Sequence, residues 1–245
     1  MIFGNGEICN SKENKIIKSD LIENYDFLLF FDSRAMLINE KDYKNSFFYK
    51  LIEIFNKKSI SYIAISRPKN LTVFSTIINF LQLNKNLKFI NLITNVGFVD
   101  CTPKKYTNIE DINIQISQFS KICNEIIKFG NYELNGGETE VLHSIKYSKE
   151  YINELNTLFH NCFKQSYFIN TPLVLENIEM KRKRPKSFFS QLETTNSLIN
   201  ELVSIDINKN RLIDISKIIH TYDGVHYTNT GHKKIYEKII EELNL

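Results

Sequence analysis

The segment Asp223-Gly224-Val225-His226 combines residue types and spacing that suit acid–base chemistry. An Asp three residues before a His, on one tight turn, can accept a hydrogen bond from Nδ1 of the ring and leave Nε2 free to take a serine proton. Gly224 lets such a turn form without a side-chain clash. The segment therefore predicts the acid and base of a triad. The alternative is a surface turn in which Asp223 caps the following helix and His226 is solvated.

The apolar patterns along the chain predict the fold that would hold these residues. Residues 25–31 form a continuous apolar run, as a strand buried on both faces requires. Further strands are expected at residues 61–66, 88–94, 166–170 and 211–215. Helices are expected at residues 47–57, 71–83, 109–129, 146–163, 186–203 and from 231 onward, with a glycine-containing loop near Gly136-Gly137. This alternation predicts a three-layer α/β/α sandwich with a mostly parallel sheet and right-handed crossovers.

Polar residues follow several of these expected strands. They are Asp32-Ser33, Ser66-Arg67, Thr94-Asn95 and the segment after Ile215. In a parallel sheet the working residues gather at the carboxyl ends of the strands, because the loops there converge on one crevice. We therefore expect these four loops to lie on one rim.

The segment from Asp223 to His232 resembles the C-terminal block of the SGNH (GDSL-like) hydrolases, where Asp-x-x-His supplies the triad acid and base. In that family the nucleophilic serine belongs to a Gly-Asp-Ser block after the first strand, where this chain has Phe31-Asp32-Ser33. The family's third block places an Asn after the third strand, as Asn95 is placed here. The resemblance implies an SGNH-type, flavodoxin-like fold and a triad of Ser33, His226 and Asp223. It also implies an oxyanion hole formed by the Asn95 amide and the Ser33 backbone N–H.

The sequence departs from this family pattern at two places. Phe31 stands where the first block usually has Gly, and residues 66–70 lack the Gly whose N–H normally completes the oxyanion hole. Arg67 is the candidate to bind substrate and donate in place of that missing amide. Ser33 and Asn95 also have simpler interpretations, as a helix cap and as a turn residue before Gly97.

The resemblance implies a serine-dependent acyl-ester hydrolase, an esterase or deacetylase that removes a small acyl group from a carbohydrate or similar metabolite. One alternative is an O-acyltransferase that uses the same triad, with a sugar hydroxyl in place of water. Another is a catalytically silent domain that keeps the fold for binding. The partner is then a small-molecule or carbohydrate ester, and the oligomeric state stays open.

Length and composition predict one domain over residues 25–245, with residues 1–24 as a peripheral extension. The formal charge of +3 does not build the one-sided basic surface of a nucleic-acid binder. The one dense charge run, at residues 181–185, is expected to be a solvated loop; the alternative is a patch for an anionic sugar, a phosphate or an acyl-carrier partner.

The spacing of possible metal ligands and the length of the apolar runs bear on cofactors and on location. The four cysteines form no Cys-x-x-Cys pair, and no His, Cys, Asp or Glu group has metal spacing, so we expect neither a metal nor another cofactor. The remaining histidines are expected to be structural or exposed. No apolar run is long enough to span a bilayer, and the first residues lack a signal-peptide pattern, so a cytoplasmic location is expected.

Overall fold

Six strands form the main sheet of the computed structural model, which describes residues 7–10, 23–36, 43–66, 71–133, 139–174, 186–218 and 220–245. Their spatial order is β1-β3-β2-β4-β7-β8. The strands are β1 (Glu7–Asn10), β2 (Glu23–Phe31), β3 (Tyr62–Ser66), β4 (Leu87–Thr94), β7 (Gln165–Ile169) and β8 (Asn210–Ile213). Only β1 runs antiparallel to its neighbour, so the predicted mostly parallel sheet is confirmed.

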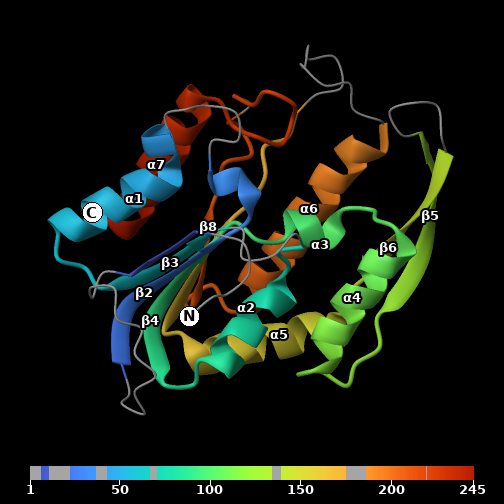
Figure 1. The fold of residues 1–245 in the computed structure, drawn as a ribbon, viewed down its shortest axis with the longest axis horizontal. Coiled ribbons are helices and arrows are strands. Elements are labelled where there is room, and N and C mark those ends of the chain that lie inside the picture. The colour runs from blue at the N-terminus through green and yellow to red at the C-terminus, as the bar shows by residue number, and fades with distance from the viewer. Residues whose placement is uncertain are drawn as a thin grey trace.

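Helices cover both faces of this sheet. They are α1 (Phe47–Lys57), α2 (Phe74–Leu83), α3 (Phe98–Cys101), α4 (Tyr106–Ser117), α5 (Lys149–Cys162), α6 (Lys186–Ile205) and α7 (Asn229–Leu243). Helices α1 and α7 lie on one side, and α2, α5 and α6 lie on the other (Figure 1). The predicted three-layer α/β/α sandwich is therefore confirmed.

Strand β2 shows why the sequence forms a sheet of this kind. Its side chains alternate between two cores: Leu28 and Phe30 pack with α2, α5 and α6, whereas Leu29 and Phe31 pack with α1 and α7. All four are fully buried. A strand that is covered on both faces has no polar side, which explains its continuous apolar run.

Helix α1 is fixed at its start by a cap and by aromatic packing. The Ser46 side chain accepts a hydrogen bond from the Tyr49 N–H, which satisfies a backbone group that the first helical turn leaves unpaired. Phe47 and Phe48 then pack edge-on against Phe31 at ring-centroid distances of 5.5 and 6.0 Å. This packing ties α1 to the carboxyl end of β2.

The structure corrects the predicted long helix at residues 109–129. Helix α4 ends at Ser117, and residues Glu125–Glu133 form strand β5, which pairs antiparallel with β6 (Thr139–Lys146) in a separate two-stranded sheet. The prediction was wrong because Ile116, Phe119 and Ile122 continue a three-residue spacing beyond the helix. The expected loop at Gly136-Gly137 lies outside the described residues.

The N-terminal segment contributes to the sheet as well. Residues 7–10, within the expected extension, form β1 at the edge beside β3. Within the described residues, no helix is long and apolar enough to cross a membrane.

Helix α7 begins beside the Asp223–His226 segment, and its start is closely packed. The Thr228 side chain caps the helix by accepting from the Gly231 N–H, and the Thr228 N–H donates to the His220 carbonyl at 2.9 Å. A Cβ at Gly231 would lie 2.4 Å from that same carbonyl oxygen. Only glycine therefore fits between the helix and the preceding loop.

We expect Gly231→Ala to lower the free energy of unfolding by about 1–3 kcal/mol, because the added methyl displaces the His220 carbonyl. This loss occurs although alanine favours a helix over glycine by about 1 kcal/mol. Urea denaturation measures the change, with the exposed Thr230→Ala as a control. A variant as stable as the wild type would show that the loop yields freely.

Candidate active site

Two candidate residues, Ser33 and Asn95, lie at the point of the sheet where the chain changes direction from one strand to the next. Counted along the chain, the five parallel strands have the order 2-1-3-4-5, with β2 first and β4 third. The chain reverses direction across the sheet between β2 and β4, and clefts of α/β proteins form at such a point. Ser33 follows β2 and Asn95 follows β4, so both lie at this position.

The Asp223–His226 loop forms the predicted carboxylate–imidazole pair. Nδ1 of His226 lies 3.1 Å from Oδ2 of Asp223. Oδ1 of Asp223 accepts hydrogen bonds from the backbone N–H groups of Val225 and His226, at 3.0 and 2.9 Å. Because the carboxylate can only accept, Nδ1 carries the proton, and Nε2 of the neutral ring is an acceptor.

The backbone of this loop is closed by its own short-range contacts. Thr221 and Tyr227 form a β-bridge, and the Tyr222 N–H donates to the His226 carbonyl at 2.8 Å. Gly224 has a φ of 80°, in the left-handed region that favours glycine. The side chain of His226 is 28% exposed, so the imidazole can meet a solute while its partner carboxylate, at 14%, is mostly covered.

Ser33 begins a short 3₁₀ turn, Ser33–Ala35, directly after β2. Asp32 caps this turn, because its Oδ1 accepts from the Arg34 N–H at 2.9 Å. Asp32 is buried, whereas Ser33 is partly exposed. The turn thus fixes the backbone on both sides of the serine and leaves the serine itself within reach of solvent.

Asn95 is fully buried and faces the same turn. Its Oδ1 accepts from the Asp32 N–H at 2.8 Å, and its Nδ2 donates to Asp32 Oδ1 at 3.0 Å. These partners fix the orientation of the amide, since a backbone N–H only donates and a carboxylate only accepts. Asn95 therefore joins the end of β4 to the turn at Ser33–Ala35 and has one further Nδ2 hydrogen to donate.

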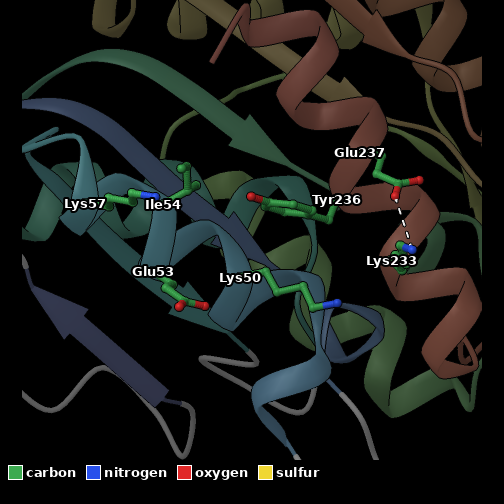
Figure 2. A pocket seen from close by; sticks show the side chains of 7 residues that line it. All are labelled: Lys50, Glu53, Ile54, Lys57, Lys233, Tyr236 and Glu237. Carbon is green, nitrogen blue, oxygen red and sulfur yellow. Dashed lines mark ion pairs between the residues drawn. The ribbon is translucent and has the colours of Figure 1, made fainter.

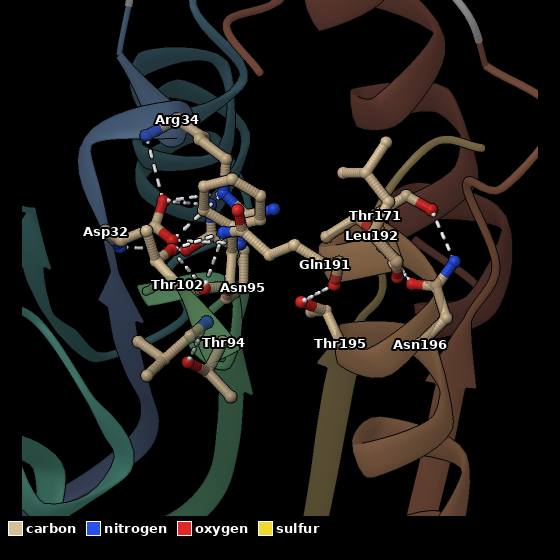
Figure 3. Close-up of polar contacts among 12 residues, drawn as sticks. Asp32, Arg34, Thr94, Asn95, Thr102, Thr171, Gln191, Leu192, Thr195 and Asn196 are labelled. Carbon is tan, nitrogen blue, oxygen red and sulfur yellow. Dashed lines mark hydrogen bonds and ion pairs between the residues drawn. The ribbon is translucent and has the colours of Figure 1, made fainter. Parts of the chain in front are cut away.

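Arg34 is a site residue that the sequence interpretation missed. Its guanidinium forms a two-armed contact with Asp32, with Nε at 2.9 Å and Nη2 at 2.8 Å from Oδ2, and both side chains are 2% exposed. Nη2 also donates to the Asn95 backbone carbonyl, and Figure 3 shows the three residues converging. The signal was an Asp and an Arg in an otherwise apolar stretch, residues 27–36, where charges can be buried only as a pair.

The rim next to β7 is held by a second set of polar contacts. The Asn196 side chain of α6 accepts from the Thr171 N–H at 2.8 Å and donates to the Thr171 carbonyl at 2.9 Å (Figure 3). Asn170 bridges to the end of β8, donating to Asp214 and accepting from the Ile215 N–H. The segment that leads toward Asp223 is therefore fixed to β7.

An apolar cluster lies beside the Asp223–His226 loop. Its buried members come from α3, the segment after β7, α6 and the loop itself: Phe98, Val174, Phe188, Leu192 and Val225. Val225, the residue before His226, is therefore packed into an apolar cluster with α3, the segment after β7 and α6.

Not all predicted site residues meet in the structure. The hydrogen bond of the His226 ring goes to Asp223, and within the described residues none joins the ring to Ser33. Such bonds are often long without substrate and shorten in the reacting complex. Arg67 and the charged run at residues 181–185 lie outside the described residues.

A separate groove lies between α1 and α7 and has a volume of about 350 Å³. Figure 2 shows that five charged side chains line it together with Ile54 and Tyr236. The charged residues are Lys50, Glu53, Lys57, Lys233 and Glu237. None of the candidate catalytic residues is among them. In the part of the chain that the structure describes, no cluster of three His, Cys, Asp or Glu side chains is placed to hold a metal ion.

Comparison with solved structures finds folds of the same type. LAE5, an alpha/beta hydrolase enzyme from the metagenome of Lake Arreo, Spain, is 10% identical with a TM-score of 0.52, over 90% of this chain and 95% of that one. Est24, a carbohydrate acetylesterase from Sinorhizobium meliloti, is 12% identical with a TM-score of 0.52, over 90% and 98%. The acetyl xylan esterase AlAXEase is 13% identical with a TM-score of 0.50, over 89% and 99%.

No protein-family model matches the sequence, and no curated protein matches it. The similarity is therefore one of structure, carried by nearly the whole length of each chain. The chain therefore shares the α/β/α fold of these hydrolase and esterase structures and few of their residues.

His232, in the first turn of α7, is buried behind this loop. Its Nδ1 accepts from the Phe47 N–H at 3.3 Å, and its ring packs 5.5 Å from those of Phe47 and Tyr227. Burial, together with Lys50 and His226, lowers the pKa of His232 to about 3. The ring is therefore neutral and links the start of α1 to the residue that follows His226.

His232 should make the protein less stable in acid. The unfolded ring takes up a proton near its usual pKa of about 6.5, but the folded ring does so only near the lowered pKa, so stability falls as the pH drops between the two. We expect His232→Asn, which keeps an acceptor near the Nδ1 position, to flatten this dependence by up to about 1.4 kcal/mol per pH unit. Urea denaturation of both proteins at several pH values between 4 and 8 measures the two slopes. Parallel slopes would contradict the buried neutral ring.

Proposed function

We propose that this protein is a serine-dependent acyl-ester hydrolase in which Ser33 is the nucleophile, His226 the base and Asp223 the acid. The main support is the Asp223–His226 pair, whose 3.1 Å contact holds the ring in the tautomer that leaves Nε2 free. The fold adds support, because Ser33 directly follows β2 at the carboxyl end of the parallel sheet, the edge at which such folds carry their working residues.

In the proposed cycle, Nε2 of His226 takes the proton of Ser33 Oγ as the oxygen attacks the ester carbonyl carbon. Asp223 stabilises the imidazolium that forms. The intermediate then collapses, and the leaving alcohol takes the proton back from His226. A water molecule, deprotonated by the same ring, releases the acyl group from Ser33 and regenerates the enzyme.

The charge that develops on the carbonyl oxygen needs donors. We assign this role to the Ser33 backbone N–H and to the remaining Nδ2 hydrogen of Asn95, with Arg67 proposed as a substrate-binding donor. Asp32 supports the assignment, because its two contacts to Asn95 hold the amide beside the nucleophile turn. Donors that are fixed in advance stabilise the oxyanion without reorganising during the reaction.

For the substrate we propose a short acyl ester of a carbohydrate. Two of the similar structures are a carbohydrate acetylesterase and an acetyl xylan esterase. Val225, the residue before His226, and Phe98 belong to one apolar cluster, and apolar side chains of this kind suit the methyl of a short acyl group.

The nucleophile can be tested by covalent labelling. We expect wild-type protein to react with a fluorophosphonate at Ser33 and to hydrolyse p-nitrophenyl acetate, and we expect Ser33→Ala to lose both reactions. Intact-protein and peptide mass spectrometry locate the label, and Ser204→Ala, an exposed serine of α6, is the matched control. A wild-type protein that neither reacts with the fluorophosphonate nor hydrolyses the ester would contradict the proposal. Full activity in Ser33→Ala would contradict it as well.

The acid can be tested separately from the nucleophile. Asp223→Asn keeps an oxygen for the two backbone N–H groups but places an amide against Nδ1, which favours the wrong tautomer of His226. We expect kcat to fall by about 10²–10⁴ with little change in KM, since acid–base catalysis is lost while binding is kept. Steady-state kinetics on p-nitrophenyl acetate measure this split, with the exposed Asp111→Asn as a control. A KM effect at constant kcat would assign Asp223 to binding instead.

A further inference from the structure

Arg34 is buried to 1% exposure, contacts the segments that carry Ser33 and Asn95, and interacts electrostatically with Tyr227, the residue after His226. We infer that its guanidinium is a positioning residue, which fixes the Ser33 turn, Asn95 and the His226 loop relative to one another. The inference rests on the proposed function, since it concerns the geometry of that site.

The first contact is with the nucleophile turn. Nε of Arg34 lies 3.1 and 2.9 Å from the two carboxylate oxygens of Asp32, and Nη2 adds a third contact at 2.8 Å. Asp32 and Arg34 flank Ser33 on either side, and the carboxylate also accepts the Arg34 N–H. The serine backbone is thus held between two residues that are locked to each other.

The second contact reaches β4. Nη2 donates to the Asn95 carbonyl, while the guanidinium lies 4.8 Å from the ring centroid of Phe98. Phe98 belongs to the apolar cluster that contains Val225, so Arg34 joins the turn both to the candidate oxyanion residue and to this cluster. A planar guanidinium can make edge contacts and a face contact at once, which an ammonium group cannot.

Arg34 also interacts electrostatically with Tyr227, the residue after His226. Neither Nη1 of Arg34 nor the Tyr227 hydroxyl has a regular hydrogen bond within the described residues, yet the two groups are close enough to affect each other's pKa. Burial raises the pKa of Tyr227 to about 12, and the nearby guanidinium opposes that rise. The phenol is therefore neutral, with its oxygen available to the cation.

These contacts matter because the reaction depends on the separation of Ser33 and His226. The two residues come from segments far apart in the chain, and a displacement of about 1 Å can slow a reaction by about 10². Burial acts to lower the pKa of Arg34, but Asp32 and Tyr227 together outweigh it, so the pKa is raised and the cation is permanent. The three segments are joined by one fixed charge.

The test compares the reactivity of Ser33 per folded molecule in Arg34→Lys and in Tyr227→Phe. Lysine keeps the charge beside Asp32 but loses the planar fork, and phenylalanine removes only the hydroxyl. The exposed Arg211→Lys is the matched control for the first change. Circular dichroism and thermal melting give the folded fraction of each variant.

For Arg34→Lys we expect labelling by the fluorophosphonate to reach the same final stoichiometry as in the wild type, but about 10–100-fold more slowly. For p-nitrophenyl acetate, kcat should fall by a similar factor while KM changes by no more than about twofold, because binding is not the interaction that is lost. Tyr227→Phe should reduce the labelling rate by a smaller factor, and Arg211→Lys should leave it unchanged.

A folded Arg34→Lys that labels at the wild-type rate would overturn the inference and leave the esterase proposal intact, because Arg34 would then only stabilise the fold. If Arg34→Lys does not fold, Tyr227→Phe decides, and an unchanged labelling rate in that variant overturns the inference. A wild-type protein that is never labelled would instead remove the proposed function, and the positioning role with it.

Discussion

A parallel sheet with helices on both faces excludes water from both of its sides, and the arrangement of this protein follows from that constraint. Polar side chains that react with a substrate can therefore lie only at the edge where the strands end. Along β2 the side chains from Phe27 to Phe31 are apolar, and the buried charge pair of Asp32 and Arg34 follows directly. The end of β4 shows the same change from apolar to polar side chains, because polar Asn95 follows its last buried residues.

Polar groups that lie on this boundary are still mostly buried, so they must satisfy one another. The carboxylate of Asp32 is matched by a guanidinium and an amide, and the amide of Asn196 is matched by the backbone of Thr171. Taking one member from such a set leaves the others buried without a partner, which costs about 3–5 kcal/mol for a charge pair. The rim is rigid because its groups have few alternative partners.

The sequence was sufficient for the parts of the fold that depend on local patterns. The run at residues 25–31 fits only a strand covered on both faces, and the Asp223–His226 pair forms within a single loop, so both were predictable. Strand β5 was not, because its partner β6 is a separate segment further along the chain, and the local spacing near Ile122 resembles that of a helix. Arg34 was missed for a related reason. Arg34 can be buried because Asn95 and Tyr227 lie close to it, and these residues are far from it in the sequence.

The Asp223–His226 loop follows β8, which among the described strands lies at the edge of the sheet and pairs only with β7. An edge strand with one partner opens at a lower free energy than the centre of a sheet. Once β8 detaches and the loop also separates from Arg34, the loop's own contacts at Thr221 and Tyr222 keep it together as one unit. The carboxylate and imidazole would then stay paired while their distance from β2 grows. Native-state hydrogen exchange would register this as early opening of β8 amides, at denaturant concentrations where those of β2 remain protected.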